Sequence, residues 1–101
     1  MQWLRAGQIE PALSNSRAVL ADRQANPEAC YNAACVLAQA VPLDPAHAAE
    51  RAAMAMALLR TAAAKGYFKI PGRLASFDGD PDMAPIREYR EFGEFRAGLA
   101  P

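Results

Sequence analysis

Two similar dipeptides, Asn26-Pro27 and Asp44-Pro45, constrain the fold of this chain more than any other feature. Asn and Asp are favoured as helix N-caps, and Pro is tolerated at the first helical position because no backbone donor is needed there. Each dipeptide therefore predicts the start of a helix. Pro42 cannot continue the first helix, and Gly66 is a typical stop for the second.

These signals predict one helix from Pro27 to Ala40 or Val41 and another from Pro45 to Lys65. We expect the two helices to pack antiparallel, joined by a loop. Their apolar positions are mostly small, which lets helix axes approach near the short end of the usual separation of about 8–10 Å. In the first helix these positions are Cys30, Ala33, Ala34, Val36 and Leu37, and in the second they are Ala48, Ala52, Ala55, Leu59 and Ala62.

The flanking segments also have helical patterns. A helix is predicted from Ile9 to Ala25, a short one from Pro71 to Ser76, and a last one from Arg90 to Leu99. Between the last two lies a stretch rich in turn residues, with Asp80 and Asp82 as candidate helix caps. Together these segments indicate a single all-α domain.

Composition narrows the class of protein. The 101 residues carry 11 Lys and Arg against 11 Asp and Glu, a net charge of 0. This balance argues against a nucleic-acid interface and against a polybasic membrane anchor. The longest apolar run, Ala52 to Leu59, is too short to span a bilayer, and the N-terminus lacks the layout of a signal peptide. A cytoplasmic protein is expected.

Candidate reactive groups have simpler structural explanations. Cys30 and Cys35 are five positions apart, which places them on different sides of a helix, so we expect two buried thiols and no disulfide. His47 is expected to be exposed or to make a local cap contact. Asp78, Asp80 and Asp82 alternate like the start of a calcium loop, but the sixth and twelfth positions of such a loop would be Met and Tyr, where it needs Gly and Glu. No metal or cofactor is predicted.

Three stretches resemble the tetratricopeptide-repeat family, whose 34-residue unit is a pair of helices. YNAACVLA (31–38) resembles the first helix of a repeat, and AMALLRTAAAKGY (55–67) resembles the second. DPDMAPIREYREF (80–92) resembles the closing segment of bacterial tetratricopeptide-like arrays, with matches at Asp80, Pro81, Asp82, Pro85, Arg87 and Phe92. The chain departs from the family in having extra residues between Ala38 and Ala55 and in lacking most of the first helix of its first repeat.

The resemblance implies a superhelix of antiparallel helix pairs with a C-terminal capping helix. Residues 1–101 would form one domain, with a partial first repeat (1–25), a central helix pair (26–66) and a closing segment with the cap helix (67–101). The first helix of each pair would line a concave groove. By resemblance, the residues facing that groove are Tyr31, Asn32, Cys35 and Gln39.

An Asn at the place of Asn32 can bond to the backbone of a bound peptide in this family. Lys69 and Arg73, four positions apart, could clamp a carboxylate if their segment is helical, although Pro71 lies between them. Solvated basic residues are the simpler interpretation of these two cations.

The functional prediction is a protein–protein interaction or scaffolding module that binds a peptide or a partner helix in the groove. The alternative is a regulatory or accessory domain of a larger bacterial enzyme, such as a protein kinase. No nucleophile–base pair or phosphate loop is apparent in the sequence, so no enzyme activity is predicted. Trp3 and Leu4, exposed at an open N-terminal end, would favour contact with more chain or with a second copy in a homodimer.

Overall fold

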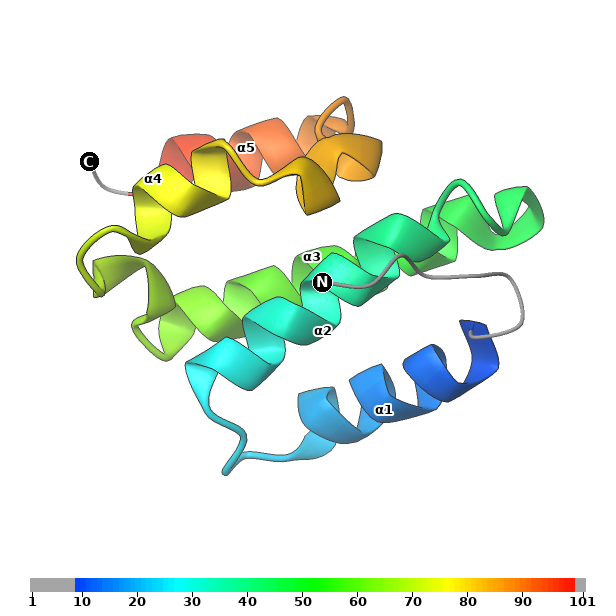
Figure 1. Ribbon diagram of the computed structural model, residues 1–101, viewed down its shortest axis with the longest axis horizontal. Coiled ribbons are helices and arrows are strands. Elements are labelled where there is room, and N and C mark those ends of the chain that lie inside the picture. The colour runs from blue at the N-terminus through cyan, green and yellow to red at the C-terminus, as the bar shows by residue number, and fades with distance from the viewer. Residues whose placement is uncertain (1–8, 100–101) are drawn as a thin grey trace.

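The computed structural model describes residues 9–99, and within this range every regular element is a helix (Figure 1). The elements are α1 (Ile9–Ala21), α2 (Pro27–Ala40), η2 (Pro45–His47), α3 (Ala48–Ala64), η3 (Tyr67–Lys69), α4 (Arg73–Asp78), η4 (Pro81–Ile86) and α5 (Arg90–Gly98), where η denotes a 3-10 turn. The prediction of an all-α fold is confirmed. Helices α2 and α3 form the centre, with α1 packed on one side and α4 and α5 on the other.

Helix α2 begins and ends as predicted. The side chain of Asn26 accepts a hydrogen bond of 2.8 Å from the backbone N–H of Ala29, and Pro27 occupies the first turn. The helix ends at Ala40, two residues before Pro42. The cap satisfies one of the backbone donors that a helix start leaves unpaired.

The predicted start of the next helix at Pro45 is wrong. Residues 45–47 form the turn η2, and the α-helix begins at Ala48. Asp44 does not cap either element, because its carboxylate is held by the side chains of His47 and Arg51, each at 3.1 Å. The expected local contact of His47 is therefore present. At the other end, Gly66 has a φ of 88°, a left-handed conformation that suits glycine and stops the helix as predicted.

Two other boundaries differ from the prediction. Helix α1 ends at Ala21 and not at Ala25, because Asp22 starts a turn in which its side chain accepts a 2.8 Å hydrogen bond from the N–H of Gln24. The short helix α4 begins at Arg73 and not at Pro71, since Gly72 has a φ of 85°, which no right-handed helix contains. Helix α5 begins at Arg90 as predicted.

The central helix pair is built on alanine contacts. Ala34 on α2 and Ala55 and Ala62 on α3 are completely buried, and Leu37 and Leu59 fill the spaces beside them. Small residues at these positions let the two helices approach closely. Cys30 and Cys35 are buried free thiols, as predicted.

Aromatic side chains join the last third of the chain to this pair. The ring of Tyr31 on α2 stacks on Tyr67 of η3, with centroids 4.6 Å apart and planes 11° apart. Phe77 of α4 stacks in turn on Phe92 of α5 at 5.3 Å. Phe68 contacts rings of both stacks, and Phe95 packs against Phe68 and Phe77. Such pairs contribute about 0.5–1.5 kcal/mol each beyond the burial of their area.

No helix in residues 9–99 combines the length and the apolar content needed to cross a lipid bilayer. Trp3 and Leu4, which the sequence places at an open end, lie outside the described residues.

Candidate functional site

The two predicted clamp residues, Lys69 and Arg73, belong to different elements. Lys69 ends η3, Arg73 begins α4, and Gly72 turns the backbone between them. The continuous helix on which a clamp depends is therefore not formed. Arg73 donates a 3.0 Å hydrogen bond to the carboxylate of Glu28 on α2, and its guanidinium lies 5.4 Å from the ring centre of Tyr67.

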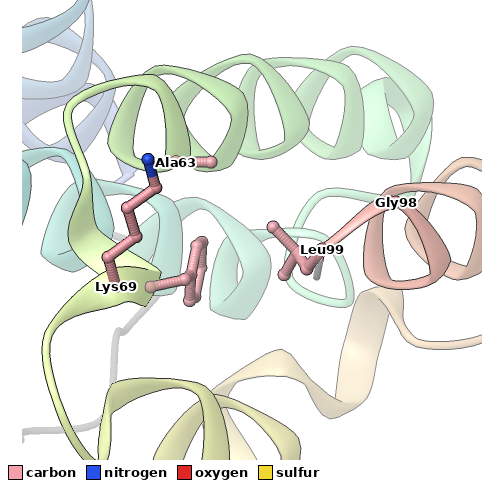
Figure 2. Close-up of a pocket in the computed structure, with 5 residues that line it drawn as sticks. Ala63, Lys69, Gly98 and Leu99 are labelled. Atoms are coloured by element: carbon pink, nitrogen blue, oxygen red, sulfur yellow. The ribbon is translucent and has the colours of Figure 1, made fainter. Parts of the chain in front are cut away.

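Lys69 has a different environment. Its ammonium group forms no hydrogen bond or ion pair with any side chain in residues 9–99. The side chain extends from η3 toward α3 and borders a hollow of about 280 Å³, into which Leu99 points from the end of α5 (Figure 2). The hollow is lined by Ala63, Phe68, Lys69, Gly98 and Leu99. It combines an apolar wall with the positive charge of Lys69.

The four predicted groove residues on α2 are not equally accessible. Tyr31 and Gln39 are each 7% exposed and Cys35 is 2% exposed, whereas Asn32 is exposed. The elements η3 and η4 pack against α2, and Tyr31 and Cys35 contact the start of η4. A partner can therefore reach Asn32 directly, but it reaches Tyr31 or Cys35 only if other parts of the chain move.

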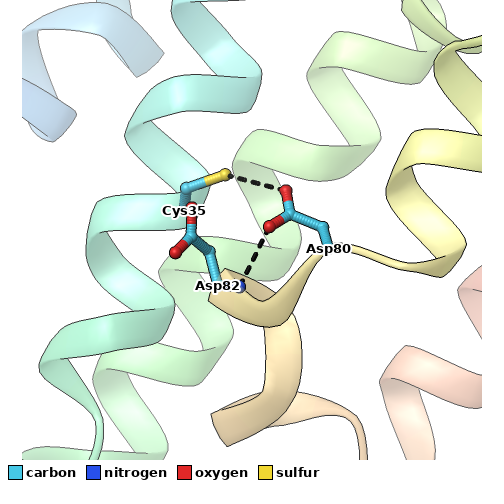
Figure 3. A group of neighbouring side chains, drawn as sticks. All are labelled: Cys35, Asp80 and Asp82. Atoms are coloured by element: carbon cyan, nitrogen blue, oxygen red, sulfur yellow. Dashed lines mark hydrogen bonds between the residues drawn. The ribbon is translucent and has the colours of Figure 1, made fainter. Parts of the chain in front are cut away.

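A partly buried polar cluster holds η4 on α2. The hydroxyl of Tyr31 donates a hydrogen bond of 2.5 Å to Oδ2 of Asp80. The thiol of Cys35 points to the same oxygen at 3.8 Å, and the backbone N–H of Asp82 donates to Oδ1 of Asp80 at 2.9 Å (Figure 3). Asp80 is thus the N-cap of η4, as predicted, and also a cross-link to α2. Asp82, the second candidate cap, lies inside the first turn of η4.

The cluster keeps its hydroxyl and thiol protonated. Burial, with the hydrogen bond to Asp80, raises the pKa of Tyr31 far above its usual value. Burial and the carboxylates of Asp80 and Asp82 raise the pKa of the Cys35 thiol to about 12. Burial and the neighbouring Asp80 also raise the pKa of Asp82. The thiolate is the nucleophilic form of cysteine, so Cys35 is a poor nucleophile at neutral pH.

Three side chains of this cluster, those of Cys35, Asp80 and Asp82, carry atoms of the types that bind metal ions. The sulfur of Cys35 and one carboxylate oxygen each from Asp80 and Asp82 lie within 4.8 Å of one another. Both oxygens of Asp80, however, already accept hydrogen bonds from Tyr31 and from the N–H of Asp82. Capping and cross-linking account for this geometry without an ion.

Arg87 fixes the backbone next to the cluster. One nitrogen of its guanidinium donates to the carbonyl oxygens of Phe77 at 3.1 Å and Asp80 at 2.8 Å. The guanidinium carbon also lies 5.6 Å from the ring centre of Phe92. Asp80, Arg87 and Phe92 are three of the six residues that carried the resemblance to a closing segment, and Arg87 contacts the other two. The sequence did not predict that Tyr31 would bond to Asp80, because no local pattern links positions so distant in the chain.

Comparisons with protein-family models, with curated proteins and with solved structures find no match to this chain. The site must therefore be interpreted from its own geometry.

Proposed function

We propose that this chain is a protein–protein interaction module built from tetratricopeptide-like helix pairs, and that it acts by binding and not by catalysis. The observation that carries the proposal is the stacking of α1, α2 and α3 through small buried residues, with Ala34 and Ala55 at its centre. Consecutive helices packed in this way form a rigid scaffold whose outward side chains are available to a partner.

The protonated state of the Cys35 thiol also favours binding over chemistry. Cys35 is buried, and its pKa of about 12 keeps the thiol protonated. Catalytic cysteines have the opposite property, a lowered pKa in a partly exposed, electropositive environment.

The binding edge that we propose lies on α2. Glu28, Asn32 and Val36 follow one another at intervals of four residues, so they share one side of the helix. Asn32 is exposed there, Val36 is half-buried, and Glu28 is fixed by its ion pair with Arg73 at 3.0 Å. An extended partner segment would pack on Val36 and exchange hydrogen bonds with the amide of Asn32, which offers both donors and an acceptor.

Site-specific photocrosslinking in cells tests this proposal. The photoreactive residue p-benzoylphenylalanine is placed at Asn32 and, as a control, at Ala53, an exposed position on α3. We expect a discrete crosslinked protein from position 32 that is absent from position 53, and Asn32→Ala should compete poorly for that protein. Crosslinking that is absent from position 32, or equal at the two positions, would refute the proposed edge.

A further inference from the structure

The peptide bond between Asp78 and Gly79 is the bond in this sequence most prone to isomerise. The backbone nitrogen of the residue after an aspartate can attack the side-chain carboxyl carbon, and glycine allows this best because it has no Cβ to hinder the approach. Asp78 is the only aspartate in the sequence that precedes glycine, and no asparagine does so. Asp44 and Asp80 precede proline, whose nitrogen has no proton to lose.

The structure leaves this bond accessible to water. Asp78 ends α4, Gly79 follows it as the C-cap, and both residues are exposed. Beyond its two chain neighbours, a Cβ at Gly79 would meet only the carbonyl oxygen of Ala75, at 3.9 Å. The N–H of Gly79 donates a 3.3 Å hydrogen bond to that oxygen at the end of the helix, where helices commonly fray.

Arg96 of α5 fixes both oxygens of the Asp78 carboxylate. Its Nε donates to Oδ1 at 2.6 Å, and a terminal nitrogen of the guanidinium donates to Oδ2 at 2.9 Å. Figure 1 shows the end of the chain that these bonds tie together, with α4 in yellow and α5 in orange and red. Two parallel bonds between an arginine and a carboxylate are stronger and more specific in geometry than a single one.

This contact opposes ring closure in two ways. The hydrogen bonds from Arg96 lower the pKa of Asp78 and keep the carboxyl ionised, whereas an oxygen that must leave as water has to be protonated first. The attack also requires the carboxyl carbon to turn its face to the nitrogen of Gly79. Two bonds to a residue on another helix restrict that rotation.

We propose that Asp78–Gly79 is a site of spontaneous backbone isomerisation, which the ion pair with Arg96 suppresses. The nitrogen of Gly79 forms a bond to the side-chain carboxyl carbon of Asp78. The hydroxyl of the protonated carboxyl and the proton of the nitrogen leave together as water, which gives a five-membered succinimide. Water then adds to either carbonyl carbon of the ring and breaks its bond to nitrogen, so the products are aspartate and isoaspartate.

Isoaspartate at this position would loosen the closing part of the fold. The backbone then runs through the side-chain carbon, so it gains one methylene, and the free carboxylate is the former main-chain carboxyl. The two bonds to Arg96 are lost because they depend on the original side chain. Asp80, which accepts the hydrogen bond from Tyr31, lies two positions further on and is displaced by the longer backbone.

Peptide mapping after storage tests the inference. The folded protein is stored for weeks at neutral pH and digested, and the aspartate and isoaspartate forms of each peptide are separated by liquid chromatography with mass spectrometry. We expect isoaspartate at Asp78 and only background levels at Asp22 and Asp82. Arg96→Gln should raise the rate at Asp78 about two- to fivefold, the factor by which a surface ion pair usually shifts an equilibrium.

Control variants separate protection by the ion pair from a general loss of stability. Arg90→Gln removes another arginine of α5, which pairs with Glu94, and should isomerise as the unmodified protein does. Ala34→Leu disturbs the centre of the fold without touching the pair and should also leave the rate unchanged. In the Arg96→Gln protein, Gly79→Ala should return the rate to background, because it adds the missing Cβ.

Two results would overturn the inference. The first is an equal rate at Asp78 in Arg96→Gln and in the unmodified protein, and the second is an acceleration by Ala34→Leu as large as that by Arg96→Gln. The purified isoaspartate form should also melt at a lower temperature than the parent protein. An unchanged melting temperature would contradict the loosening of the closing part of the fold.

Discussion

The hydroxyl of Tyr31 donates a hydrogen bond of 2.5 Å to the carboxylate of Asp80, a residue 49 positions further along the chain. One residue lies on α2 and the other caps η4, so this bond ties the end of the domain to its central helix pair. The ring of Tyr31 also stacks on Tyr67. A single side chain therefore contacts both turns, η3 and η4, that cover this side of α2.

The close approach of α2 and α3 can be tested by enlarging its smallest residues. Ala34→Leu or Ala55→Leu should lower the free energy of unfolding by about 1–3 kcal/mol, because both sites are fully buried and the added methyl groups must displace their neighbours. Ala53→Leu, on the exposed side of α3, should change it by less than about 0.5 kcal/mol. Urea unfolding measures all three. Equal stabilities would show that these faces are assigned incorrectly.

The partly buried polar cluster should make the protein sensitive to alkali. The pKa of Cys35 is raised from 9.0 to about 12 in the folded protein, so the folded state holds this proton more tightly than the unfolded state. The stability linked to the thiol is fully present below pH 9 and is lost as the pH rises toward 12. Urea unfolding between pH 7 and 11 should show this decline, and Cys35→Ala should reduce it. The same profile in both proteins would contradict the proposed role of the thiol.

Arg87 should contribute more to stability than its charge suggests. Its guanidinium donates to the carbonyl oxygens of Phe77 and Asp80, and Arg87→Gln would leave both acceptors without that donor. We expect a loss of about 1.5–3 kcal/mol, the usual range for hydrogen bonds that involve a charged group. Arg90→Gln is the control, since the side chain of Arg90 is 92% exposed and forms an ion pair with Glu94 one turn away. Its removal should cost less than about 0.5 kcal/mol in thermal or urea unfolding, and a similar loss in both variants would exclude the bridging role.

Local chemistry explains which parts of the fold were predictable. The cap at Asn26, the left-handed stop at Gly66 and the alanine stripe of α3 each depend on neighbouring residues, and each was found where the sequence indicated it. The start at Asp44 was wrong because that carboxylate bonds to His47 and Arg51 in place of the backbone. A side chain with competing partners cannot be assigned as a cap from its type alone.

The candidate site was less predictable, because the burial of its residues depends on parts of the chain that are distant in sequence. Asn32 was identified from the family resemblance and Lys69 from its spacing to Arg73, and both are accessible. The burial of Tyr31, Cys35 and Gln39 depends on how the chain folds back after Gly79. The spacing of residues within α2 does not predict this. The apolar hollow beside Lys69 likewise requires α3, η3 and α5 to meet.

A double-mutant cycle between Tyr31 and Asp80 tests most directly whether the end of the chain is a fixed cover on α2, leaving Asn32 as the accessible edge. Tyr31→Phe keeps the aromatic stack, Asp80→Asn keeps the shape of the cap, and the double variant removes the pair. The free energy of unfolding of the four proteins should give a coupling of about 1–3 kcal/mol, as expected for a partly buried hydrogen bond to a carboxylate. A coupling indistinguishable from zero would show that this hydrogen bond does not hold η4 on α2.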